Sequence, residues 1–172
     1  LTNIPSGMLE KKAPVIIDIG ANVGYFSLAA LASFPTAHLF SFEPHPYCFG
    51  VLQDHRDAFP DFDWEIQREA VGSTAGSITL STKSVDEFTT KAGNLQKEDD
   101  WVQFECPSTQ LDGFIDEKNL ETVDLLKLDC EGAEYDILYN LPDQSFDQIK
   151  AICAETHRGD GRTENNTTLA QY

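Results

Sequence analysis

The fold is decided by residues 15–31, which read VIIDIGANVGYFSLAAL. The first five residues form an apolar, β-branched run with one acid, which is typical of a buried strand. After Gly24 the apolar side chains return with helical spacing, as Phe26 and Ala30 show. Gly20 and Gly24 allow positive φ and close backbone approach between the two elements. A strand, a glycine turn and a helix form the first unit of an open α/β sheet, and the helix N-terminus directs free N–H groups at whatever lies above the strand end.

The rest of the chain alternates strands with helices. Further strands are expected at 37–42, 62–66, 76–80, 104–109, 123–129 and 149–155, and helices are expected from 25 to about 35, from 46, from 111 and over 135–141. The segment 69–72 is expected to close the third strand. This alternation predicts a three-layer α/β sandwich, Rossmann-like, around a mostly parallel, doubly wound sheet.

Length and charge limit the classes of function. The 172 residues predict a single domain over 1–172, with a lead-in at 1–14, a polar surface insertion at 82–103 and a polar tail at 158–172. The formal net charge of -17 argues against a nucleic-acid partner and against an anionic membrane surface. The four cysteines lack C-x-x-C spacing, and no signal peptide or membrane span is visible, so a cytoplasmic protein with reduced thiols is expected.

The strand ends carry acids. Glu43, Glu69, Asp129 with Glu131, and Glu155 each follow an expected strand. Ligands of such sheets bind beyond the carboxyl ends of the strands, so several carboxylates there suggest a ligand with hydroxyls or positive charge. Glu43 lies 19 residues past Gly24, where a carboxylate can accept both hydroxyl protons of a ribose. The turn lacks G-x-G-x-x-G and G-x-x-x-x-G-K-[ST], which disfavours a dinucleotide or a Walker-type phosphate loop.

These residues also resemble a known family. The segments that carry the resemblance are DIGANVGYF at 18–26, FEP at 42–44, EAVG at 69–72, LKLDCEGAEY at 126–135 and AETH at 154–157. Together, in this order and spacing, they are similar to the FkbM family of S-adenosylmethionine-dependent methyltransferases. The resemblance spans about residues 14–157.

The resemblance implies a class I methyltransferase fold with S-adenosylmethionine lying across the strand ends. The implied cofactor-binding residues are Asp18, Gly20, Asn22 and Gly24 around the methionine and ribose portion, Glu43 followed by Pro44 at the ribose hydroxyls, Glu69 and Ala70 on the adenine side, and Asp129. It also implies O-methylation of a small molecule, a sugar or a secondary metabolite. The family fold continues into a terminal antiparallel pair of strands, and the polar tail predicts that this pair is missing or cut here.

A hydroxyl acceptor benefits from a general base. His157, Asp129 and Glu131 lie at neighbouring expected strand ends and are the candidate catalytic residues. His157 is favoured as the base, because histidine can accept a proton near neutral pH. Asp129 is expected to be a positioning group. Two alternatives stay open: a non-catalytic nucleoside- or protein-binding domain with this fold, and a divalent cation among the acids, although no residues are spaced as a dedicated metal loop. The sequence leaves the oligomeric state open.

Overall fold

The computed structural model describes residues 12–82, 90–92 and 101–155. The elements in chain order are β1 (Val15–Ile19), α1 (Tyr25–Ser33), β2 (His38–Phe42), α2 (Pro46–Ala58), β3 (Asp63–Gln67), β4 (Ala70–Gly72), β5 (Gly76–Thr82), β6 (Thr90–Ala92), β7 (Val102–Gln110), α3 (Leu111–Glu117), β8 (Leu125–Leu128), α4 (Glu134–Asn140), α5 (Asp143–Asp147) and β9 (Ile152–Ala154).

The central sheet has the order β3-β2-β1-β8-β9, and all its strand pairs are parallel. The chain runs outward from β1 to β3 and then returns to the other side of β1 at β8, so the strand order reverses between β1 and β8. Such a switch point is where open α/β sheets bind ligands, outside the carboxyl ends of the strands. The predicted parallel α/β sandwich is confirmed.

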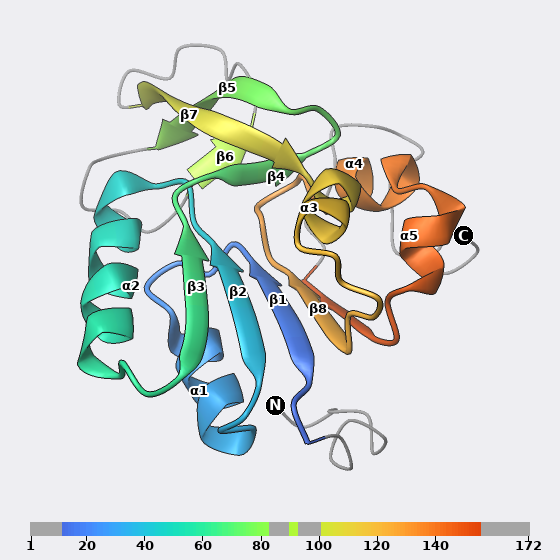
Figure 1. The fold of residues 1–172 in the computed structure, drawn as a ribbon. Helices are drawn as coiled ribbons and strands as arrows, with labels where there is room; N and C mark the ends of the chain where they lie inside the picture. Colours follow the sequence, from blue (N-terminus) through green and yellow to red (C-terminus); the bar gives the residue numbers. More distant parts are fainter. Residues whose placement is uncertain (1–11, 83–89, 93–100, 156–172) are drawn as a thin grey trace.

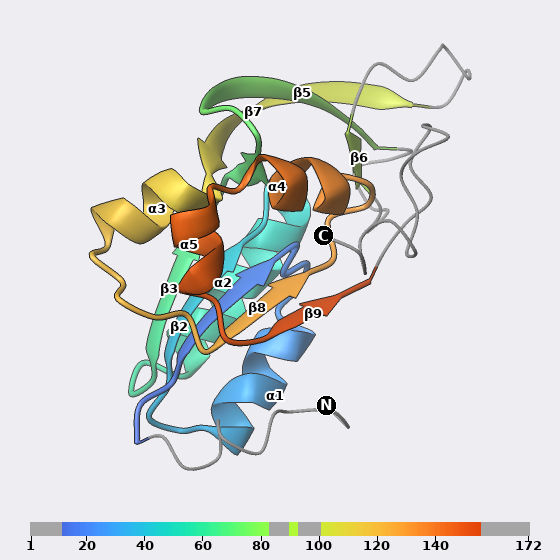
Figure 2. The ribbon, with the colours of Figure 1, turned by 90° about the vertical axis from the view of Figure 1, so that its right-hand side faces the viewer.

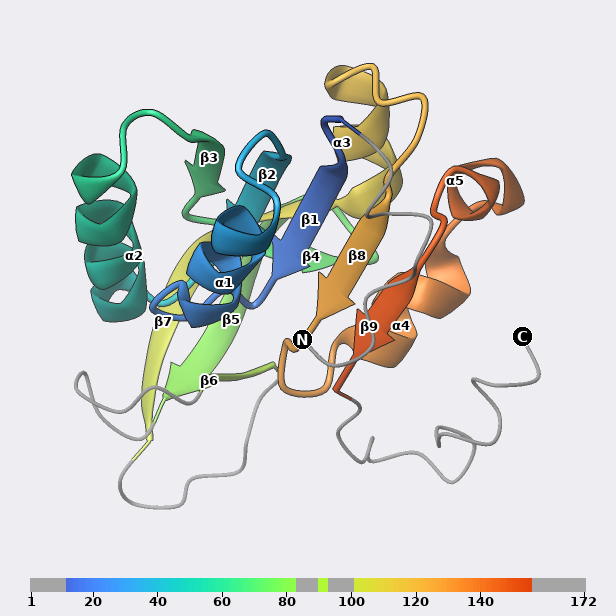
Figure 3. The ribbon, with the colours of Figure 1, turned by 90° about the horizontal axis from the view of Figure 1, so that it is seen from below.

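Helices cover both faces of this sheet (Figures 1 and 3). Successive residues of a strand point to opposite faces, so each apolar strand contributes to two cores. On one face α1 and α2 pack against Ile16, Leu39 and Trp64. On the other face α3 and α4 pack against side chains such as Ile17 and Phe40. The inner strands are therefore apolar at almost every position.

A second sheet, with the order β4-β7-β5-β6, lies across the ends of β1, β2 and β3 (Figures 1 and 2). Its β5 pairs antiparallel with β6 and β7, and β4 pairs parallel with β7. The prediction for 69–72 is wrong at this point: β3 ends at Gln67, and β4 belongs to the second sheet. Glu69 therefore lies between two strands rather than between a strand and a helix, because the chain crosses directly from one sheet to the other.

Several predictions fall outside the described residues. These are the lead-in up to residue 11, most of the expected insertion at 82–103, the polar tail, and His157. Within the expected insertion, the described parts are the end of β5, the short strand β6 and the start of β7. Among the helices that the structure describes, none is long and apolar enough to cross a membrane.

Candidate functional site

The glycine turn after β1 has three residues with positive φ: Gly20 at 75°, Asn22 at 53° and Gly24 at 89°. The Gly20 and Ala21 N–H groups both donate to the Phe42 carbonyl, at 3.0 and 2.9 Å, which ties the turn to the end of β2. A Cβ atom at Gly20 would lie 1.9 Å from the Asp129 carbonyl oxygen. Glycine is required there because the turn passes directly against the chain that leaves β8.

Glu43 fastens the same turn from its other side. Its carboxylate accepts the Asn22 N–H at 2.7 Å and the His45 N–H at 2.8 Å, so it joins the glycine turn to the start of α2. The side chain is only 5% exposed, and this burial raises the pKa of Glu43 to about 7. The hydrogen bonds from the two N–H groups act in the opposite direction and lower the pKa. Each oxygen uses one lone pair for these bonds and can accept a further hydrogen bond.

A buried polar chain lies beneath the turn, on the α1 face of the sheet. The Trp64 indole N–H donates to Ser41 Oγ at 2.8 Å, Ser41 and Ser27 hydroxyls are 2.9 Å apart, and Ser27 donates to Asp18 Oδ2 at 2.6 Å. Since Ser27 uses its hydrogen on Asp18, the Ser41 hydroxyl donates to Ser27. All donors thus run in one direction, from Trp64 to the Asp18 carboxylate, which is fully buried.

Lys127 connects this chain of hydrogen bonds to the glycine turn above it. Its ammonium lies 3.1 Å from Asp18 Oδ1 and 3.5 Å from Asp129 Oδ2, and it donates to the Gly20 carbonyl at 2.8 Å. Burial raises the pKa of Asp18, and Lys127 opposes that shift. Lys127 was not among the predicted site residues. The available signal was a lysine within the apolar run 125–128, and the structure puts it in register with Asp18 of β1.

The chain after β8 is fixed by Glu134, which is fully buried. Its carboxylate accepts the Cys130 N–H and the Gly132 N–H, both at 3.0 Å, across a turn in which Glu131 and Gly132 have φ of 54° and 114°. Glu134 was not predicted as a site residue either. Its effect is to hold Asp129, Cys130 and Glu131 in one conformation beside the glycine turn.

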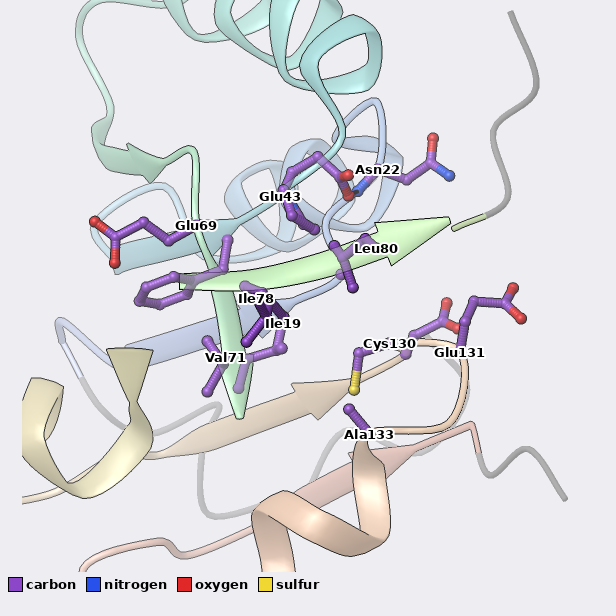
Figure 4. Close-up of a pocket in the computed structure, with 15 residues that line it drawn as sticks. Ile19, Asn22, Glu43, Glu69, Val71, Ile78, Leu80, Cys130, Glu131 and Ala133 are labelled. Carbon is purple, nitrogen blue, oxygen red and sulfur yellow. Dashed lines mark hydrogen bonds between the residues drawn. The ribbon is translucent and has the colours of Figure 1, made fainter. Parts of the chain in front are cut away.

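These loops enclose a pocket of about 740 Å³, counting space open to solvent, which we call the strand-end pocket (Figure 4). Its apolar lining comes from both sheets and comprises Ile19, Phe42, Val71, Ile78 and Leu80. Its polar and loop lining comprises Gly20, Asn22, Glu43, Pro44, Glu69, Ala70, Asp129, Cys130, Glu131 and Ala133. Burial raises the pKa of the Cys130 thiol well above its ordinary value, so this side chain adds an uncharged wall.

The strand-end pocket brings together most of the predicted site residues. Gly20, Asn22, Glu43, Pro44, Glu69, Ala70, Asp129 and Glu131 all line it. The Glu69 carboxylate points away from the other labelled side chains in Figure 4. Asp18 and Gly24 do not line the pocket. Asp18 lies beneath the turn because its position in β1 faces α1, and Gly24 begins that helix.

The pocket fits an uncharged flat group next to hydroxyls and a positive charge. Apolar side chains from both sheets supply surfaces for a flat ring. Carboxylates at Glu43 and Asp129 can accept hydroxyl hydrogens or face a cation. Among the residues that the structure describes, no three His, Cys, Asp or Glu side chains are grouped so that they could hold a metal ion.

Comparisons with known proteins find similar sequences and a similar fold. Residues 18–167 match the family model of the methyltransferase FkbM domain. Methyltransferase sdnD of Sordaria araneosa is 26% identical, over 94% of this chain and 71% of its own length. The 2-O-methyltransferase NoeI of Sinorhizobium fredii is 30% identical, over 76% of this chain and 58% of its own length. The crystal structure of methyltransferase FkbM from Methylobacillus flagellatus has the same fold, with a TM-score of 0.53 and 16% identity over 78% of this chain and 31% of that chain.

Proposed function

Since the chain belongs to the FkbM methyltransferase family, we propose that it transfers a methyl group from S-adenosylmethionine to a hydroxyl oxygen of a small molecule. The family and the relatives' names support methyl transfer, and one relative is named a 2-O-methyltransferase. The observation that carries the choice of cofactor is Glu43, a buried carboxylate at the end of β2 that lines the strand-end pocket and keeps acceptor capacity. We propose that this capacity takes the two ribose hydroxyls.

The remaining lining residues have corresponding roles in this proposal. The apolar wall near Ala70, Ile78 and Leu80 would hold the adenine ring, with Glu69 at the edge. Gly20, Asn22 and Pro44 border the ribose and methionine portion. The carboxylates of Asp129 and Glu131 would stabilise the positive charge of the cofactor.

When bound, S-adenosylmethionine supplies an activated methyl group on a sulfonium. The protein's contribution to such a displacement is to hold the donor and the acceptor oxygen in line and close together. The turns that carry Gly20 and Glu131 are both fixed by buried carboxylates, so they offer a rigid frame for this alignment. We propose that His157 is the base that takes the hydroxyl proton, a role worth about 10²–10⁴-fold in rate. Asp129 is proposed to position the reacting groups.

Calorimetric titration of the purified chain with S-adenosylmethionine and S-adenosylhomocysteine tests the proposal, with NADH as the control ligand. Micromolar binding of both sulfur nucleosides and no binding of NADH is expected. Glu43→Ala should weaken that binding, whereas Glu117→Ala, at the exposed end of α3, should not. Absence of nucleoside binding by the unmodified chain would overturn the assignment of the cofactor. Transfer of a radiolabelled methyl group to hydroxyl compounds then separates an enzyme from a domain that only binds the nucleoside.

A further inference from the structure

Lys127 places a positive charge in the apolar part of the central sheet. It lies in β8 between Leu126 and Leu128, whose side chains face α3 and α4. Because side chains alternate along a strand, Lys127 faces α1, where its side chain is 12% exposed and its ammonium lies 5.8 Å from the centre of the Phe26 ring. An ammonium with so little access to water is costly unless it is paired, so its contacts indicate its role.

The contacts of this ammonium divide between the core and the strand-end pocket. On the core side it lies 3.1 Å from Oδ1 of Asp18, whose side chain is fully buried. On the pocket side it lies 3.5 Å from Oδ2 of Asp129 and donates to the Gly20 carbonyl at 2.8 Å. Asp129 and Gly20 line the strand-end pocket, whereas Asp18 and Lys127 do not. The ammonium therefore lies directly behind a carboxylate of the pocket wall.

This position has an electrostatic consequence for a charged ligand. Under the proposed function, Asp129 and Glu131 would attract the positive charge at the sulfur of the cofactor. The ammonium of Lys127 repels that charge and so offsets part of the attraction. S-adenosylhomocysteine, the product, has no charge at its sulfur. Lys127 therefore weakens binding of the methyl donor relative to binding of the product.

Such an offset favours methyl transfer. A sulfonium loses its positive charge as the methyl group leaves, so unopposed carboxylates would stabilise the donor more than the transition state. Only interactions that are stronger in the transition state than in the ground state accelerate the chemical step. An ammonium behind Asp129 reduces the excess stabilisation of the donor and leaves the carboxylate in the pocket wall.

We propose that Lys127 is a specificity-determining residue of the strand-end pocket, and that its ammonium sets the preference of the site between the methyl donor, with its charged sulfur, and the product, with its uncharged sulfur. This rests on the proposed function for the identity of the two ligands. The charge of the side chain, rather than its effect on the fold, sets the preference.

Lys150 offers a matched control for this charge. Its ammonium lies 3.0 Å from Oδ1 of Asp124, which is 4% exposed, next to the starts of β8 and β9. Lys127 and Lys150 thus each pair with a buried aspartate, at opposite ends of the central sheet. Lys150 does not line the strand-end pocket, so removal of its charge should leave the preference unchanged.

Calorimetric titration with S-adenosylmethionine and S-adenosylhomocysteine at low ionic strength measures the preference as the ratio of the two affinities. Lys127→Met should shift this ratio towards S-adenosylmethionine by at least about threefold, because one repelling charge is lost. Asp129→Asn should shift it the other way, because one attracting charge is lost. Lys150→Met should leave it unchanged. A merely loosened turn would weaken both nucleosides by the same factor and would not move the ratio.

A second variant guards against loss of the fold, because Lys127→Met leaves Asp18 buried without its cation. Asp18→Asn combined with Lys127→Met removes the buried pair as a unit and should shift the ratio in the same direction as Lys127→Met. The proposal is overturned if the ratio stays unchanged or moves towards S-adenosylhomocysteine in these variants. Failure of the proposed function is distinguishable, because the unmodified chain would then bind neither nucleoside.

Discussion

Replacing the buried acid at the end of β2, as Glu43→Gln, should change how the stability of the fold depends on pH. Burial raises the pKa of Glu43 from its ordinary 4.5 to about 7. The folded protein therefore keeps this proton to a higher pH than the unfolded chain does. The contribution of the group to stability is complete below pH 4.5 and is lost as the pH rises through 7, because ionisation then costs more in the fold than in water.

The magnitude follows from the size of the shift. One pKa unit corresponds to 1.36 kcal/mol, so the shift of Glu43 destabilises the fold by about 3 kcal/mol when ionisation is complete. About 2–3 kcal/mol of this loss falls between pH 5 and pH 8. The side-chain amide of the variant cannot ionise. Its oxygen can accept only one of the Asn22 and His45 N–H groups, which costs about 1–3 kcal/mol at every pH.

Urea denaturation at pH 5, 6, 7 and 8, followed by the fluorescence of the buried Trp64, measures both the cost of ionising Glu43 and the cost of the lost hydrogen bond. The variant should be clearly less stable than the unmodified chain at pH 5. This difference should shrink or reverse by pH 8, a change of about 2–3 kcal/mol. Glu117→Gln, which removes a solvated charge, is the control and should keep a constant difference. A difference for Glu43→Gln that stays constant from pH 5 to pH 8 would refute the argument that this carboxyl is held protonated by burial.

Two further substitutions test the turn and the ion pair beneath it. Gly20→Ala should destabilise the fold by more than about 3 kcal/mol, because left-handed backbone costs an alanine about 1–2 kcal/mol and its Cβ would lie 1.9 Å from a carbonyl oxygen. Gly50→Ala in α2, where an added Cβ has no neighbour within 4 Å beyond its own helix, should instead stabilise the fold by about 0.5–1 kcal/mol. Equal urea midpoints for the two variants would contradict this. Lys127→Met should cost about 3–5 kcal/mol at pH 7, because it leaves the buried Asp18 carboxylate without its cation, and a loss below about 1 kcal/mol in urea denaturation would show that the pair contributes little.

The central sheet could be predicted from the sequence because its strands are buried on both faces. Runs such as 15–19 and 125–128 are apolar at nearly every position, and few other elements produce that pattern in so short a stretch. The glycine turn was predictable for a similar reason, since positive φ restricts the residue type. These features depend on local chemistry, which a single sequence shows directly.

The second sheet depends on pairing that the sequence does not show. The strand β4 has three residues, and its partner β7 begins about thirty residues later in the chain. A short strand was expected at 76–80, but the sequence does not show the sheet to which it belongs. Because Ile78 and Leu80 come from this sheet, one wall of the strand-end pocket was missing from the prediction.

The alternation of side chains along β1 explains why Asp18 does not line the strand-end pocket with the other predicted site residues. Ile17 and Ile19 face α3 and α4, so the intervening Asp18 faces α1. The motif predicts an acid at this position but not the side of the sheet on which its carboxylate lies. Lys127, in register with it on β8, supplies the missing half of the interaction.

The glycine turn is held by two buried carboxylates, and neither is the most stable choice for a core. Burial raises the pKa of both Asp18 and Glu43, and well-packed apolar groups often stabilise a core more than buried charge does. Apolar side chains, however, could not accept the Asn22 N–H, nor could they hold an ammonium against the Gly20 carbonyl. Asn22, the non-glycine residue of the turn with positive φ, keeps this sparsely populated conformation because its surroundings fix it. The fold thus gives up stability at this turn and gains one fixed backbone geometry beside the strand-end pocket, which the proposed methyl transfer would need in order to align donor and acceptor.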